Sequence, residues 1–275
     1  MKLFQNLFFS GVLVLLIFSC SGYEKALKST DYKLKYKEAM RYYNKPDYVR
    51  ASALFDQIAN VFRGTDQADT IYYCQAMSNF KQGDYILAQH YFHTFAQTYG
   101  GSPFAEEADY MSAYCYYMLS PRPELDQENT VQAIQAFQLH LIKYPDSKRS
   151  ADCKKYITEL QNKLVKKAFL SAKLYFDMED YKAAIVALNN CLIQYPDSKY
   201  REDIMYMLVK SSYLLAYNSV KAKQKDRYQN AVDEYYSFAA EFPDSKYSKE
   251  VTKYYKLASK VLGNDIDKTN ENEEN

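Results

Sequence analysis

The feature that most constrains the fold is a pentapeptide that recurs in the second half of the chain. "YPDSK" begins at Tyr144 and again at Tyr195, and "FPDSK" begins at Phe242. An alanine stands at a constant distance before each of these aromatic residues, and a bulky side chain follows each alanine at i+4. Self-similarity at a fixed spacing is typical of repeat architectures, in which one supersecondary unit is stacked several times.

The same frame fits five segments of the chain. The alanines are Ala51, Ala88, Ala133, Ala184 and Ala231, and the bulky residues that follow them are Phe55, Phe92, Phe137, Leu188 and Tyr235. Residues i and i+4 share one face of a helix, where the small residue lets a neighbouring helix approach and the larger one fills the space beside it. In the last three segments a proline then ends the helix.

This pattern resembles the second helix of the tetratricopeptide repeat (TPR), whose usual period is roughly 34 residues. The first-helix part of the TPR pattern is present as Ala39 with Tyr42 and as Ala172 with Tyr175. We therefore expect an all-α, TPR-like helical-repeat solenoid of five helix pairs plus a C-terminal helix. The single solenoid should cover residues 31–262, with repeats at about 31–63, 66–100, 103–145, 148–196 and 198–243 and a last helix at 245–262.

Local signals predict where individual helices begin and end. "DY" at Asp47, Asp84 and Asp180 predicts the start of a second helix, because Asp is a favoured N-cap. The longest helix should run from about residue 148 towards 177, where Gly and Pro are absent. Two segments, 120–128 and 218–226, are expected as lengthened turns, and residues 263–275 as a disordered acidic tail.

Composition supports helices that pack through aromatic side chains and excludes some classes of partner. The chain has 30 Tyr, no Trp and only 7 Gly, which argues against a loop-rich or all-β fold. Its 35 Lys and Arg nearly balance 34 Asp and Glu. Since nucleic-acid affinity depends on many phosphate contacts from basic residues, a balanced chain gives no reason to expect nucleic acid as a partner.

The start of the chain predicts export and lipid attachment. An apolar run from Leu7 to Phe18 follows Lys2, and it is too short to span a bilayer, which takes roughly 20 apolar residues. Residues 1–19 therefore read as a signal peptide, and "IFSC" before and at Cys20 resembles the bacterial lipobox, in which the cysteine is diacylated. An ordinary signal peptide or an uncleaved anchor helix with a chance cysteine is the alternative.

The sequence lacks the common motifs of catalytic sites. It has no P-loop, no dinucleotide-binding glycine motif and no metalloprotease or hydrolase motif, so we expect a protein that is not an enzyme and has no cofactor. His90 and His93 are the only close histidine pair, and a zinc site needs three or four ligands, so no metal site is expected. The four remaining cysteines lie in amphipathic segments and should be free buried thiols: Cys74, Cys115, Cys153 and Cys191.

A lipobox followed by five TPR-type repeats, with "YPDS" closures and a long charged helix between repeats three and four, resembles the BamD family. This family provides the lipoprotein component of the β-barrel assembly (BAM) complex of the bacterial outer membrane. The resemblance implies an outer-membrane, periplasmic-side scaffold whose partners are a BamA-type barrel subunit, other lipoproteins of the complex and unfolded outer-membrane proteins.

The resemblance also implies two sets of site residues. The docking surface for the barrel subunit is expected in repeats four and five, at Tyr181, Lys182, Arg201 and Lys223. The groove for the client peptide is expected near Tyr42, Tyr72, Tyr73 and Tyr110. The turn before Tyr181 departs from the family, because Met178 stands where family members carry an arginine. Another TPR lipoprotein of the envelope, such as a cell-wall or division factor, would share the fold and the anchor.

Overall fold

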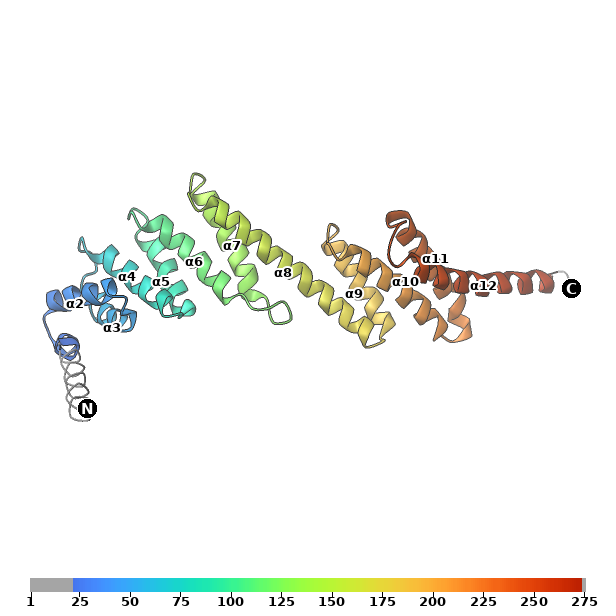
Figure 1. Ribbon diagram of the computed structural model, residues 1–275, viewed down its shortest axis with the longest axis horizontal. Coiled ribbons are helices and arrows are strands. Elements are labelled where there is room, and N and C mark those ends of the chain that lie inside the picture. The colour runs from blue at the N-terminus through green and yellow to red at the C-terminus, as the bar shows by residue number, and fades with distance from the viewer. Residues whose placement is uncertain (1–21, 274–275) are drawn as a thin grey trace, which may run out of the picture. The chain divides into compact units, whose positions relative to one another are not determined.

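The computed structural model of the chain describes residues 22–273, and within this range it contains helices and turns but no strand. A short helical segment over residues 22–28 precedes the helices labelled in Figure 1. The expected signal peptide at 1–19 and the expected lipid attachment at Cys20 lie outside the described residues, so both stay predictions. No helix in the described part of the chain combines the length and the apolar character that crossing a membrane requires.

The helices fall into two compact units. Among the described residues, the first unit includes 22–121 and 127–160, and the second includes 122–126 and 161–273. The helices of the first unit are α2 (Tyr32–Asn44), α3 (Tyr48–Ile58), α4 (Ala68–Lys81), α5 (Tyr85–Thr98), α6 (Ala105–Leu119), α7 (Glu128–Lys143) and the start of α8 (Ser150–Asp177). The second unit holds the rest of α8, then α9 (Tyr181–Gln194), α10 (Arg201–Tyr217), α11 (Lys221–Glu241) and α12 (Ser248–Glu273).

These elements confirm the all-α, TPR-like fold of five helix pairs and a C-terminal helix. Each pair is α2 with α3, α4 with α5, α6 with α7, α8 with α9, or α10 with α11, and α8 is the long helix that the sequence predicted. The expectation of one continuous solenoid over 31–262 stays a prediction, because each unit has its own internal contacts.

The second helices begin where the "DY" dipeptides predicted. Asp47, Asp84 and Asp180 are the N-caps of α3, α5 and α9, and each carboxylate accepts a hydrogen bond from a backbone N–H in the first turn. An N-cap of this kind stabilises a helix by about 1 kcal/mol, since it satisfies a donor that has no partner within the helix.

The alanine template forms the core of each helix pair. All five template alanines are buried, and so are Phe55, Phe92, Phe137 and Leu188, whereas Tyr235 is half-buried. The first-helix alanines Ala39 and Ala172 are buried as well. Small residues at these positions let the paired helices approach closely, and the large residue one turn later fills the space between them.

The serine that closes a repeat ties the closing turn to the first helix of the same pair. Ser147 accepts a hydrogen bond from the backbone N–H of Arg149 at 3.1 Å and donates one to Glu106, in the first turn of α6, at 2.6 Å. Equivalent serines donate to first-turn acids of α4 and α10: Ser102 to Asp69 at 2.8 Å, and Ser245 to Glu202 at 2.6 Å. In the α4–α5, α6–α7 and α10–α11 pairs, this serine therefore fixes the exit of the second helix onto the entry of the first.

Two segments differ from the sequence-based expectation. Residues 221–226, expected as part of a lengthened turn, form the start of α11, because Lys, Ala and Gln are good helix formers and no Gly or Pro interrupts them. At the other end, α12 continues to Glu273, past the helix end expected at 262 and into the segment expected as a disordered tail. Gly263 alone costs a helix only about 1 kcal/mol, and no proline follows it to stop the helix.

Candidate partner-binding surfaces

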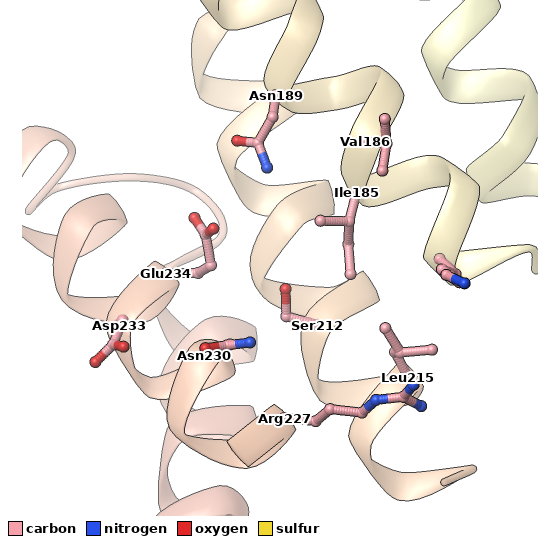
Figure 2. Close-up of a pocket in the computed structure, with 10 residues that line it drawn as sticks. Ile185, Val186, Asn189, Ser212, Leu215, Arg227, Asn230, Asp233 and Glu234 are labelled. Carbon is pink, nitrogen blue, oxygen red and sulfur yellow. The ribbon is translucent and has the colours of Figure 1, made fainter. Parts of the chain in front are cut away.

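The second unit has an open hollow of about 500 Å³ between α9, α10 and α11 (Figure 2). Its lining residues are Lys182, Ile185, Val186, Asn189, Ser212, Leu215, Arg227, Asn230, Asp233 and Glu234. The α10 residues Ser212 and Leu215 and the α9 residue Ile185 give the hollow a partly apolar interior, and amides and charged groups surround it. An apolar interior with a polar rim is the usual composition of a protein-binding surface.

Charged groups of opposite sign occupy opposite ends of this hollow. Lys182 and Arg227 lie towards the N-terminal ends of α9 and α11, and Asp233 and Glu234 lie two turns further along α11. Figure 2 shows Arg227 and Glu234 at different ends of the lining, with Asn230 between them. The hollow is therefore polarised along the helix direction.

A second hollow, of about 460 Å³, lies on the other side of α9 and shares Lys182 and Val186 with the first. Its other lining residues include Tyr175, Ala183 and Ala187. Val186 is 58% exposed, which makes it an apolar ridge between two hollows. On α9, Lys182 and Val186 thus lie between the two hollows, and we call them the α9 ridge, which a partner can contact from both sides.

The four residues predicted for docking the barrel subunit do not form one site. Lys182 lines both hollows, and its neighbour Tyr181 is half-buried beneath the same end of α9, where burial raises the pKa of its phenol. Lys223 is exposed in the first turn of α11 and is not among the lining residues of either hollow.

Arg201 is the predicted docking residue that the structure places elsewhere. Its guanidinium forms two hydrogen bonds with the carboxylate of Glu241, at the end of α11, one of them at 2.9 Å, and it donates to the carbonyl of Pro196 at 3.3 Å. It therefore joins the start of α10 to the end of α11 within this unit. The sequence could not indicate this role, because Glu241 lies 40 residues away.

The tyrosines predicted for the client groove contribute mainly to the core of the first unit. Tyr42 and Tyr110 are only 5% and 4% exposed, so their rings are packing residues. Tyr73 is half-buried with its ring stacked on Phe104 at 4.6 Å, and burial raises its pKa to about 12. Tyr72 is half-buried beside Tyr99, at a ring distance of 5.5 Å.

A row of half-buried aromatic residues on first helices is a better candidate for that groove. Tyr117 of α6 lies 4.4 Å from the ring of Tyr156 on α8 and 5.6 Å from Tyr114, whose ring is 6.0 Å from Phe80 of α4. Half-buried tyrosines offer an apolar ring and a polar hydroxyl to a bound peptide. The sequence signal was the tyrosine-rich segment around 110–118, but helical phase alone does not separate Tyr110, which is buried, from Tyr114 and Tyr117.

One cluster has the residue types of a nucleophilic triad but not its chemistry. His140 is buried, with Nδ1 2.8 Å from Asp109 and Nε2 3.3 Å from Ser147 Oγ. The Ser147 hydroxyl, however, is engaged by Arg149 and Glu106 in the turn arrangement that Ser102 and Ser245 repeat without a histidine. The cluster therefore links α6, α7 and the start of α8 structurally.

In the described part of the chain, no group of three or more His, Cys, Asp or Glu is placed so that it could hold a metal ion.

A family model for an outer membrane lipoprotein, YfiO, matches residues 28–226 and again residues 166–265. The chain belongs to the YfiO family of outer membrane lipoproteins. BamD is a member of the YfiO family, so the resemblance drawn from the sequence is supported at the level of the family. The YfiO family and the TPR-like fold are those of scaffold lipoproteins and not of enzymes.

Two other comparisons add little to the YfiO match. No curated protein is significantly similar to the chain. A solved structure described as the TPR2AB-domain:pHSP90-complex of yeast Sti1 aligns over 83% of this chain and 98% of that chain, with 14% identity and a TM-score of 0.38. A likeness this distant carries no argument about arrangement or partners, and the fold rests on the observed helix pairs.

Proposed function

We propose that this YfiO-family chain is an outer-membrane protein assembly factor, anchored by acylated Cys20 on the periplasmic side of the outer membrane. It binds a BamA-type barrel subunit, together with other lipoproteins of the complex, and helps receive unfolded outer-membrane proteins for folding and insertion. The observation that carries the proposal is the family match over residues 28–226.

The two units supply the surfaces that such a scaffold needs. In the second unit, the α9 ridge with its flanking hollows serves as the docking site for the barrel subunit, with Lys182 at its edge. In the first unit, the aromatic row of Tyr114, Tyr117 and Tyr156 serves the client peptide. A scaffold that binds two polypeptides raises their effective concentration for each other, and the acyl chains confine this encounter to the membrane surface.

Co-purification from envelope membranes tests this proposal. The chain is tagged at its C-terminus, extracted in mild detergent and compared with the Cys20→Ala variant by mass spectrometry. We expect a barrel protein with periplasmic repeat domains to co-purify with the wild type, and the variant to lose membrane retention. Recovery of cell-wall or division proteins without any such barrel protein would refute the assembly role and favour the other envelope scaffold.

A further inference from the structure

The hollow between α9 and α11 holds charged side chains that form no ion pair within the described part of the chain. Lys182 and Arg227 form no ion pair with any described residue, and neither do Asp233 and Glu234. Arg227 donates to the hydroxyl of Ser219, and Asp233 accepts from the amide of Gln229 at 2.9 Å, so both have only neutral partners.

Four ion pairs of the same unit lie outside the hollow. Ion pairs join Arg201 to Glu241, Lys173 to Asp177, Lys210 to Glu250 at 3.1 Å and Lys246 to Asp203 at 3.3 Å. Other charged side chains outside the hollow, such as Lys199, Lys223 and Asp226, form no ion pair with a described residue either, so it is the arrangement of the charges that distinguishes the hollow. Inside the hollow, the cations Lys182 of α9 and Arg227 of α11 are separated along the helix direction from Asp233 and Glu234 of α11 instead of being paired with them.

The separation follows from the register of the two helices. Lys182, Val186 and Asn189 recur at i, i+4 and i+7 along α9, and Arg227, Asn230 and Glu234 recur at i, i+3 and i+7 along α11. Both helices therefore present a cation, then an uncharged turn, and then polar or acidic groups. Seven residues of helix span about 10 Å, which is the distance between the two ends.

We propose that this hollow binds one segment of a partner protein that carries a carboxylate, an apolar side chain and a cation in that order along about 10 Å. The carboxylate lies against Lys182 and Arg227, the apolar side chain against Ile185, Val186 and Leu215, and the cation against Glu234 and Asp233. This inference rests on the proposed docking role of the second unit and specifies the chemistry of what docks there.

Charge complementarity excludes simpler occupants. A phosphate or an anionic lipid headgroup would be attracted by Lys182 and Arg227 but repelled by the two carboxylates of the same hollow. A purely apolar peptide would leave four charges facing it without partners, which costs free energy once water is displaced. A segment with both signs matches every charged group in the hollow and fixes the register of binding.

The surroundings of Glu234 favour the binding of a cation beside it. Burial raises the pKa of this carboxyl from its ordinary value, and the neighbouring carboxylate of Asp233 raises it further. A bound cation would reverse this effect by favouring the charged carboxylate. A positive group on the occupant therefore interacts more favourably with Glu234 than it would with a fully solvated carboxylate.

Site-specific photo-crosslinking tests the proposal in the intact, membrane-anchored chain. Benzoylphenylalanine replaces Asn230, at the middle of the hollow, and in a matched control it replaces Gln229, which is exposed on the same helix and does not line the hollow. Cross-linked peptides are then sequenced by mass spectrometry. We expect position 230, and not 229, to capture one segment with an acidic and a basic residue on either side of an apolar residue. The two charged residues should be four apart in a strand, where i, i+2 and i+4 share one face, or seven apart in a helix.

Charge exchange then decides whether the captured segment binds in the proposed register. Lys182→Glu with Arg227→Glu should lower recovery of the captured protein about tenfold at low salt, and changing the captured acidic residue to Lys should restore it. Capture of a segment of one charge sign, or no restoration by the exchange, would overturn the inference and leave the assembly role intact. A captured segment of mixed charge from a cell-wall or division protein, and from no protein of a barrel-assembly complex, would support the inference and refute the proposed function.

Discussion

Glu179, in the turn before α9, occupies the left-handed backbone position that Gly83 occupies in the turn before α5. Their φ angles are +61° and +83°, and the backbone N–H groups of residues 179–181 donate to the same relative positions as those of residues 83–85. The residue after each is the N-cap of the following helix. The backbone N–H of Asp180 donates to the carbonyl of Tyr175 at 3.1 Å, and that of Asp84 donates to the carbonyl of Asn79 at 3.1 Å. The two repeats therefore have the same type of turn, and in the fourth repeat a non-glycine residue, Glu179, adopts the strained positive φ.

We expect Glu179→Gly to stabilise the protein by about 1 kcal/mol, because glycine adopts a positive φ without steric cost. The matched change Gly83→Ala should destabilise by a similar amount, although the space beside Gly83 is open. Urea unfolding of both variants measures the two effects. Equal stability of Glu179→Gly and wild type would show that the turn carries no strain.

The closing serine should matter more than an ordinary surface serine. Ser147→Ala removes the hydrogen bonds to Arg149 and Glu106 and should cost about 1 kcal/mol of unfolding free energy. Ser237→Ala is the control, because Ser237 is exposed on α11 and donates only to the carbonyl of Asp233 at 3.0 Å. A loss of equal size in both variants would contradict a special role for the "PDSK" serine.

The ion pair of Arg201 and Glu241 decides whether Arg201 acts in docking or in folding. We expect Arg201→Glu to lower stability by about 1 kcal/mol, and the exchanged pair Arg201→Glu with Glu241→Arg to restore both stability and partner recovery. Thermal unfolding and co-purification are measured on the same preparations. Restored stability without restored recovery would mean that the guanidinium itself contacts the partner.

Helix pairing could be predicted from the sequence because its signals are local. The alanine at each template position, the Asp that starts α3, α5 and α9 and the proline after each of the last three second helices act within a turn or two, and the structure places all of them as expected. The start of α11 was missed because its helix-forming residues were read as a loop insertion.

The candidate sites were harder to predict because they depend on contacts distant in the sequence. Whether Tyr110 is buried or lines a groove depends on Phe137 and Arg149, and whether Arg201 is free depends on Glu241. Lys182, which was predicted for docking, lines a hollow, but the other charged residues of that hollow on α11, Arg227 and Glu234, carried no motif that would single them out.

The buried thiols should resist alkylation as long as the protein is folded. Burial raises the pKa of Cys74 and Cys153 to about 11 and that of Cys115 to about 12, so at pH 8 their thiolate fraction is far below that of an unfolded cysteine with pKa near 8.5. We expect iodoacetamide to modify them roughly a hundredfold more slowly in the native state than in denaturant.

The same shifts set the direction of the pH dependence of stability. Because the folded pKa lies above the unfolded one, the contribution of each thiol is fully present below about pH 8.5 and is lost as the pH rises towards 11. Rapid alkylation of the native protein at pH 8 would contradict the buried placement of these cysteines.

The measurement that tests the account most directly is recovery of the barrel subunit by chains altered on the α9 ridge. Val186→Asp puts a charge on the ridge between the two hollows, and Val49→Asp is the matched control, since Val49 is 65% exposed on α3 of the first unit. We predict that the tagged Val186→Asp chain loses the barrel protein from its co-purified partners, while Val49→Asp retains it at the wild-type level. Equal recovery by both variants would contradict docking on α9.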